Sequence, residues 1–310
     1  MKIGQFLDKA LTLQLGVVVP KPGPTRILNL SAAGCAHFNR PYFSVMNDFI
    51  AGGKSSLESG YTILEWALRE GNESWFHDEP SISWQLPLQV RNCIAGGRNF
   101  GAHMAESMEY WKQRGVQTHT EIPMAFIKLA SSMVATRTPV MRPQGCLWFD
   151  YEVEVTVVIG KPARDVPEDS AMDAVFGYTI LNDLSARELQ RKEMANQSIL
   201  IGKNLPGLGP LGPWILTADE VPDPTALSME LLVNGEVRQK ATCHDLIFSV
   251  PALVAHWSRM GLDVGDLITL GSPEGVAISR KPDPMPFYLK PGDIVHARVD
   301  QIGTLETLIV

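Results

Sequence analysis

The sequence predicts a strand-rich α+β fold, with a small N-terminal α+β domain ahead of a larger domain. From Ala125 onward strand-like stretches dominate, and only two helical stretches interrupt them. A doubly wound parallel sheet needs a crossover helix after almost every strand, so a β-rich core is favoured instead. The 310 residues are 45% apolar, which is ample for such a core. Loop and turn signals divide the chain into residues 1–85 and 86–310.

The N-terminal domain combines short strands with helices. Short strands are predicted at Leu13–Val19 and Arg26–Leu30, separated by the turn-rich segment Pro20–Pro24. Helical patterns follow around Tyr42–Ala51 and at Ile63–Arg69. We find no chemistry in this domain.

The larger domain begins with a strand that ends in glycines at Gly96–Gly97. Asn99 or these glycines open a helix that runs to about Gly115. Asn234-Gly235 predicts a type I′ hairpin, because both residues tolerate positive φ. Helices are also predicted at Ser185–Met194 and Ser249–Met260. Strands are predicted at Phe126–Leu129, Tyr151–Ile159, Ala174–Leu181, Trp214–Leu216, Met229–Val233, Glu236–Ala241, Leu267–Leu270, Ile294–Val299 and Gly303–Val310.

Two glutamates on the strand Tyr151–Ile159 are the first sign of a functional site. Side chains two apart on a strand point to the same face, so Glu152 and Glu154 project together. Asp183 follows the next strand and would reach the same edge of the sheet. Three carboxylates form an all-oxygen site for a hard divalent cation, with Mg²⁺ or Mn²⁺ favoured and Ca²⁺ also compatible.

These acids also have ordinary structural explanations. The glutamates would suit a solvent-facing strand edge, but the valines around them, such as Val153 and Val155, indicate burial. Two buried like charges do not persist without a cation, which favours the metal site. Asp183 alone would more often cap the following helix, and only its conjunction with the glutamates supports a role as ligand.

Arg187, Gln190 and Lys203 are candidates for substrate binding and catalysis. Arg187 and Gln190 lie three apart on the predicted helix, so both can face a metal-bound ligand. A guanidinium suits a carboxylate, and an amide suits a carbonyl or water. Lys203 precedes a glycine-rich stretch without the residue order of a Walker loop. Taken singly, Arg187 and Lys203 would more often be surface residues.

His103 and Glu106 form a candidate acid–base pair. They lie three apart on the predicted helix and therefore share a face. A histidine oriented by a carboxylate can take a proton from water near neutral pH, although this spacing is also common on helix surfaces. Ser272, in the turn-like loop 270–276, offers a hydroxyl where a substrate carboxylate could bind.

Charge and hydropathy exclude several classes of protein. The formal net charge is −7 and basic residues form no cluster, which argues against nucleic-acid binding. The longest apolar runs are far shorter than the ~20 residues of a membrane span, and a signal-peptide pattern is lacking. The isolated cysteines suit reduced thiols rather than a disulfide framework or a zinc site. We expect a cytoplasmic protein that binds neither nucleic acid nor membrane.

Motifs in a fixed order resemble the fumarylacetoacetate hydrolase family. The pair Glu152-x-Glu154 is followed by N-D-x-S-A-R-x-x-Q at 182–190 and by Gly202-Lys203. The resemblance runs from about Val90 to the C-terminus, and the N-terminal segment resembles that of longer members. The other matching motifs are G-R-N-F-x-x-H-x-x-E at 97–106, K-x-x-S-S from 128, D-Y-E-x-E at 150–154, V-I-G-K at 158–161, L-G-P-W at 211–214, V-N-G-E from 233, F-S-V from 248 and Y-L-K-P-G-D at 288–293.

The resemblance implies a fold and a set of residue roles. The fold is a distorted β-roll, commonly assembled as a homodimer, with 86–310 as the catalytic domain. The implied roles are Mg²⁺ or Mn²⁺ binding by Glu152, Glu154 and Asp183, a lid position for His103 and Glu106, and contacts with a 2-oxo acid for Arg187, Gln190 and Lys203. This chain departs from the family in two places: Leu270-Gly271-Ser272-Pro273 stands where relatives commonly have T-G-T-P, and the stretch around 207–212 reads as an insertion that could reshape the pocket.

These features favour a metal-dependent hydrolase that cleaves a C–C bond in a 2,4-dioxo acid of the fumarylpyruvate or acylpyruvate type. His103, polarised by Glu106, would activate water, while Lys203 and Arg187 would stabilise the developing negative charge. A decarboxylase, a 2-hydroxymuconate-type isomerase and a dehydratase or hydrolase of a 2-keto-3-deoxy sugar acid stay open as alternatives, because each needs the same enolate. A catalytically silent relative that binds a metabolite is a further alternative.

Overall fold

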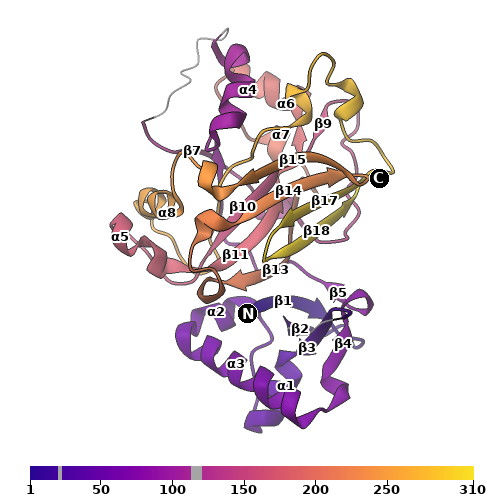
Figure 1. Cartoon of the computed structure of the whole chain (residues 1–310), viewed down its shortest axis with the longest axis vertical. Coiled ribbons are helices and arrows are strands. Elements are labelled where there is room, and N and C mark those ends of the chain that lie inside the picture. Colours follow the sequence, from indigo (N-terminus) through magenta and orange to yellow (C-terminus); the bar gives the residue numbers. More distant parts are fainter. Residues whose placement is uncertain (20–22, 113–120) are drawn as a thin grey trace.

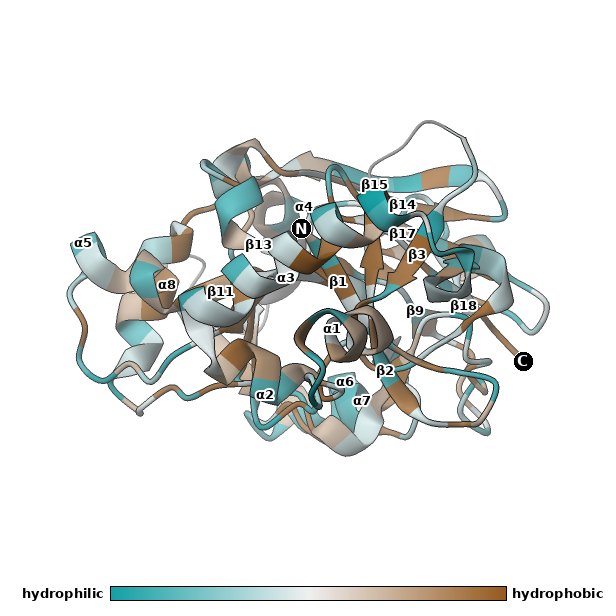
Figure 2. Ribbon diagram, turned by 90° about the horizontal axis from the view of Figure 1, so that it is seen from below, coloured by the Kyte–Doolittle hydropathy of each residue, from teal (hydrophilic) through white to brown (hydrophobic). Residues whose placement is uncertain are grey.

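The computed structural model describes residues 1–19, 23–112 and 121–310. The N-terminal part folds into five strands and three helices: β1 (Lys2–Leu7), β2 (Leu13–Val18), β3 (Arg26–Asn29), β4 (Phe76–Asp78), β5 (Ser83–Trp84), α1 (Leu30–Phe38), α2 (Met46–Ala51) and α3 (Gly53–Glu70). Figure 2 shows α1 and α3 on the near side of β1 and β2, with α2 beside them. Apolar side chains of the helices, such as Phe49 and Ile63, pack on those of β2 and β3, such as Leu15 and Leu28.

The remaining chain is dominated by strands. Its strands are β6 (Cys93–Gly97), β7 (Met124–Ile127), β8 (Met133–Ala135), β9 (Phe149–Asp150), β10 (Val153–Ile159), β11 (Val175–Asn182), β12 (Ser185–Ala186), β13 (Gly209–Thr217), β14 (Ser228–Val233), β15 (Glu236–Thr242), β16 (Leu267–Thr269), β17 (Ile294–Val299) and β18 (Gly303–Leu308). Its helices are α4 (Gly101–Lys112), α5 (Glu168–Ala171), α6 (Arg187–Ala195), α7 (Ile201–Asn204) and α8 (Val250–Ser258). The predicted strand-rich α+β class is confirmed.

A 12-stranded mixed sheet runs through both parts of the molecule (Figure 1). Its order is β4-β3-β2-β1-β13-β11-β10-β16-β6-β7, with β5 paired to β1 and β8 paired to β13. A second sheet, β15-β14-β17-β18, packs against β10, β11 and β13. The predicted hairpin at Asn234-Gly235 joins β14 to β15, and both residues have positive φ, 51° and 83°.

The register of β10 and β11 positions the acidic residues. Val153 lies opposite Asn182, so Glu152 and Asp183 face each other just beyond the last pair. The backbone N–H of Asp183 donates to the carbonyl oxygen of Glu152 at 2.8 Å. All residues of β10 are buried, because the β-branched side chains of Val and Ile fill the space on both faces of the strand.

Several predicted elements differ from the observed ones. Strand β1 and helix α1 were not predicted, and α6 begins at Arg187 because Ser185 belongs to β12. The stretch expected as a pocket insertion enters strand β13 at Gly209, and none of its residues lines the cavity of the site. The predicted end of α4 at Gly115 lies outside the described residues. Among those residues no helix combines the length and apolar character needed to cross a membrane.

Candidate metal and active site

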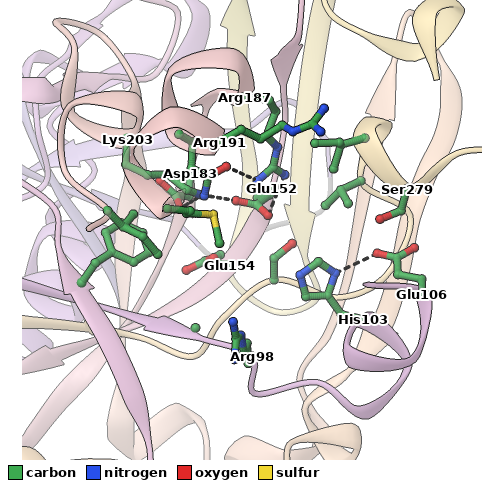
Figure 3. Close-up of a pocket in the computed structure, with 18 of the residues that line it drawn as sticks. Arg98, His103, Glu106, Glu152, Glu154, Asp183, Arg187, Arg191, Lys203 and Ser279 are labelled. Carbon is green, nitrogen blue, oxygen red and sulfur yellow. Dashed lines mark hydrogen bonds and ion pairs between the residues drawn. The ribbon is translucent and has the colours of Figure 1, made fainter. Parts of the chain in front are cut away.

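Three buried carboxylates meet where β10 begins and β11 ends. Glu152 precedes β10, Glu154 lies within it and Asp183 follows β11, and one oxygen of each lies within 4.8 Å of the others. Their exposed fractions are 4%, 2% and 0%. Figure 3 shows the three side chains converging on one point. The structure thus brings together the three ligands expected from the sequence.

Two buried lysines reach into this cluster. The Lys203 ammonium donates to both Glu152 and Asp183. Lys128 donates to Asp183 Oδ1 at 2.6 Å and to the carbonyl oxygens of Lys203 and Leu208 at 2.5 Å and 2.7 Å. Burial lowers the pKa of Lys128. Burial acts in the same direction on Lys203, but its pairing with Asp183 and Glu152 outweighs this effect, and the pKa of Lys203 is raised. Lys128 was not among the predicted site residues.

Glu154 shows that this donor set fits a divalent cation. Its Oε2 atom is buried and has no hydrogen-bond partner among the described residues. Burial, together with the charges of Asp183 and Glu152, raises its pKa well above the ordinary value. Bound to an ion, Glu154 would gain the missing partner. The carboxylates Glu152, Glu154 and Asp183 would therefore hold a divalent cation.

The charge balance around the cluster agrees with that conclusion. Buried acids exceed buried bases by one, and a divalent cation would turn this excess into one net positive charge, which suits an anionic substrate. The acids are Asp150, Glu152, Glu154 and Asp183, and the bases are Lys128, Arg187 and Lys203.

Arg187 connects the cluster to other parts of the site. Its Nη2 donates to Glu152 Oε1 at 2.9 Å, its Nε to Asp150 at 2.8 Å and its Nη1 to Gln190 Oε1 at 2.9 Å. Burial by itself raises the pKa of Glu152, but Arg187 and Lys203 hold it well below the ordinary range. Asp150 also accepts from the backbone N–H groups of Ala277 and Ile278, so it ties Arg187 to the 275–281 loop.

His103 and Glu106 are in direct contact on helix α4. The His103 Nδ1 atom lies 2.8 Å from Glu106 Oε1, and the second oxygen of Glu106 accepts from the backbone N–H of Gly275 at 3.1 Å. In Figure 3 the imidazole lies between Glu106 and the three carboxylates. Glu106 therefore fixes the imidazole ring, and the opposite edge of the ring faces the carboxylate cluster.

Ser272 is the last of the predicted residues and lies beside a residue that was not predicted. Its Oγ accepts from the side-chain amide of Gln239 at 3.0 Å. The Gln239 oxygen accepts from the backbone N–H of Val153 at 2.9 Å, next to the cluster. All of the predicted site residues line one cavity of about 380 Å³, a size that suits a small metabolite.

Two curated proteins resemble most of this chain. Oxaloacetate tautomerase fahd2 of Xenopus laevis is 33% identical over 267 residues, covering 86% of this chain and 78% of that protein. Oxaloacetate tautomerase YisK of Bacillus subtilis is 33% identical over 266 residues, covering 84% of each.

Solved structures match the fold over the whole chain. Maleylpyruvate hydrolase from Sphingobium sp. SYK-6, in complex with manganese(II) and pyruvate, matches with a TM-score of 0.74 and 27% identity, covering 100% of this chain and 99% of that one. The 5-carboxymethyl-2-hydroxymuconate delta-isomerase from Mycobacterium smegmatis matches with a TM-score of 0.72 and 26% identity over the same shares.

The model of the fumarylacetoacetate (FAA) hydrolase C-terminal domain matches residues 92–310. This range contains the carboxylate cluster, the His103–Glu106 pair and every other predicted site residue, and it agrees with the ordered motifs found in the sequence. The chain belongs to the fumarylacetoacetate hydrolase family.

Proposed function

We propose that this protein is a divalent-metal-dependent hydrolase that cleaves a C–C bond in a 2,4-dioxo acid of the acylpyruvate type. The observation that carries this proposal is the His103–Glu106 pair, held at 2.8 Å on the wall of the cavity that contains the carboxylates. A base held beside a metal site, without being one of its ligands, suits the activation of water. The products would be a carboxylic acid and pyruvate.

The protein groups divide the chemistry between them. With Nδ1 donating to Glu106, the Nε2 atom of His103 can accept a proton from water and later return it to the leaving carbon. Glu106 stabilises the imidazolium formed in between. A divalent cation bound by the carboxylates would supply Lewis-acid polarisation of the 2-oxo group. The Lys203 ammonium would contribute a fixed positive charge where negative charge develops on the substrate.

A second candidate reaction is the keto–enol tautomerisation of a 2-oxo acid such as oxaloacetate. It is favoured by the two relatives that are 33% identical over at least 84% of the chain and carry that name. His103 would then take a proton from the carbon beside the 2-oxo group and deliver it to the enol oxygen. Tautomerisation differs from hydrolysis in needing no water as reactant.

Product identification separates the two reactions. We expect the Mn²⁺-loaded protein to convert acetylpyruvate or fumarylpyruvate to pyruvate and an acid, and EDTA to abolish this turnover. His103→Gln should lower kcat about 100- to 10,000-fold while Mn²⁺ affinity stays unchanged. Fast tautomerisation of oxaloacetate without cleavage of any 2,4-dioxo acid would replace the first candidate by the second. Cleavage at the wild-type rate by His103→Gln would remove the proposed base.

A further inference from the structure

The floor and the rim of the cavity carry opposite charges. The floor holds the buried carboxylate cluster, whereas the partly or fully exposed residues Arg98, Arg191, Arg280 and Lys281 line the wall above it. Among the described lining residues outside the cluster, Glu106 is the remaining carboxylate, and it is engaged with His103 and Gly275. Figure 3 shows Arg98 and Arg191 on opposite sides of the carboxylates.

Arg280, one of these cations, is anchored by the surrounding chain. Its Nη2 atom donates to the carbonyl oxygens of Arg238 and Gly275, the latter at 3.1 Å. Its guanidinium lies 5.3 Å from the centre of the Phe287 ring, and the guanidinium of Arg238 lies 4.7 Å from the same ring. The side chain is therefore held in one place by backbone acceptors and an aromatic face.

The charge of Arg280 is not neutralised within the part of the chain that the structure describes. No carboxylate pairs with it there, and its Nε atom is buried without a hydrogen-bond partner. The neighbouring Arg238 adds a second positive charge, and its ion pair at 3.0 Å is with Glu236, a largely exposed residue. A fixed, partly desolvated guanidinium beside a cavity attracts an anion, and the Nη1 group of Arg280 is left to donate a charge-assisted hydrogen bond to a carboxylate.

The position of Arg280 relates this charge to the reacting end of a substrate. Gly275 donates its N–H to Glu106 and offers its carbonyl oxygen to Arg280, so the two side chains flank one residue of the loop. Ser279 precedes Arg280 and lies beside Glu106 (Figure 3). Seen from the carboxylate cluster in Figure 3, it lies beyond His103. A substrate chelated over the carboxylates would extend past His103 towards Arg280.

We propose that Arg280 binds a second, distal carboxylate of the substrate, which makes 2-oxo dicarboxylic acids the substrate class of this site. This inference rests on the proposed function, in which the 2-oxo acid end of the substrate binds at the carboxylate cluster. It assigns specificity to a residue outside the motifs that carry the chemistry. Lys281, which also lines the cavity, adds positive charge at the same rim.

Binding of two matched ligands tests the proposal without turnover. The Mn²⁺-loaded protein is titrated calorimetrically with 2-oxoglutarate and with 2-oxopentanoate, which have the same chain length and differ in the distal carboxylate. We expect wild type to bind the dicarboxylate about 10- to 100-fold more tightly, the range of charge-assisted hydrogen bonds. Arg280→Gln should abolish this preference and leave the affinity for 2-oxopentanoate within about threefold. Arg259→Gln, an exposed arginine outside the cavity, is the matched control.

The other outcomes are equally decisive. Equal affinity of wild type for both ligands overturns the proposal, and so does an equal loss for both ligands in Arg280→Gln, which would mark a purely structural role. Arg280→Lys keeps the charge and should retain part of the preference, so it carries the test if Arg280→Gln does not fold. If the preference holds but no 2,4-dioxo acid is cleaved, the proposed reaction fails and the carboxylate subsite stands.

Discussion

Glu154 is the residue whose surroundings most directly call for a bound cation. It lies next to Glu152 and Asp183, yet neither buried lysine donates to it, because Lys128 and Lys203 are engaged elsewhere. Removing its charge should therefore relieve repulsion in the metal-free protein and abolish binding of the metal. These two effects have opposite signs, which makes the substitution informative.

For Glu154→Gln we expect unchanged or higher thermal stability in EDTA and a loss of Mn²⁺ affinity of about 100-fold or more. In wild type, Mn²⁺ at 100 times its Kd should add about 2.7 kcal/mol to the free energy of unfolding, and the variant should lose this gain. Differential scanning calorimetry with and without Mn²⁺ measures both effects. Asp173→Asn, on an exposed side chain, is the control. An undiminished Mn²⁺ shift in Glu154→Gln would contradict the site.

Asp150 has a positioning role that can be tested separately from the metal. It is fully buried and accepts from Arg187 and from the backbone N–H groups of Ala277 and Ile278. Asp150→Asn keeps the shape but leaves Arg187 with less compensation, so we expect a loss of about 2–4 kcal/mol in urea unfolding. The Asp173→Asn control should change stability by less than about 0.5 kcal/mol. Equal effects of the two substitutions would show that Asp150 contributes little.

Some site residues can be predicted from the sequence because they follow from local features, whereas others depend on contacts between distant parts of the chain. Glu152, Glu154 and Asp183 follow from strand periodicity and strand ends, which are local features. Lys128 could not be assigned in this way, because its acceptors include Leu208, 80 residues away. Gln239 is likewise defined by distant partners. Such residues become visible only when the register of the sheet is known.

At the scale of elements, β13 shows how tertiary pairing overrides local propensity. Its sequence GPLGPWILT contains two prolines and two glycines, which is typical of a loop. The strand nevertheless pairs with β1, β8 and β11, and its pairing with β11 is irregular between Tyr178 and Ile180, where Pro213 is accommodated. Helix α1 escaped prediction because its small residues give no amphipathic pattern.

The close approach of β11 to β13 depends on Gly177. A Cβ atom at this position would overlap the carbonyl oxygen of Leu216 in the neighbouring strand. We expect Gly177→Ala to lower the free energy of unfolding by about 2–3 kcal/mol. Gly101→Ala is the matched control, since nothing lies within 4 Å of its Cβ position, and it should be neutral or stabilising by up to about 1 kcal/mol. Urea denaturation of both variants provides the comparison, and a tolerated Gly177→Ala would show that the strands separate easily.

At the scale of the whole molecule, the two parts of the chain share one sheet and one hydrophobic cluster. Strand β1 pairs with β13, with Ile3 opposite Ile215. The cluster that contains Phe49 and Ile63 also contains Val158 and Leu181 from the strands that carry the site. The N-terminal part therefore completes the support of β10 and β11.

This continuity predicts a single cooperative unfolding transition for the full chain. We expect a fragment of residues 86–310 to be insoluble or molten, because it would expose one edge of β13 and its own part of the shared cluster. Calorimetry of the full chain and circular dichroism of the fragment test this expectation. A soluble fragment with a sharp melt, or two separate transitions in the full chain, would show that residues 1–85 fold as an independent domain.

The pairing of β1 with β13 also bears on how the protein is made. Lys2 leaves the ribosome 214 residues before its partner Leu216, an interval of about 10 to 40 s at ordinary rates of translation. During that time the edge of β1 that pairs with β13 has no partner. The nascent chain therefore carries an unpaired strand edge that can aggregate until β13 is made. The yield of folded protein should depend on the chaperones present during synthesis more strongly than for a protein whose contacts are mainly local.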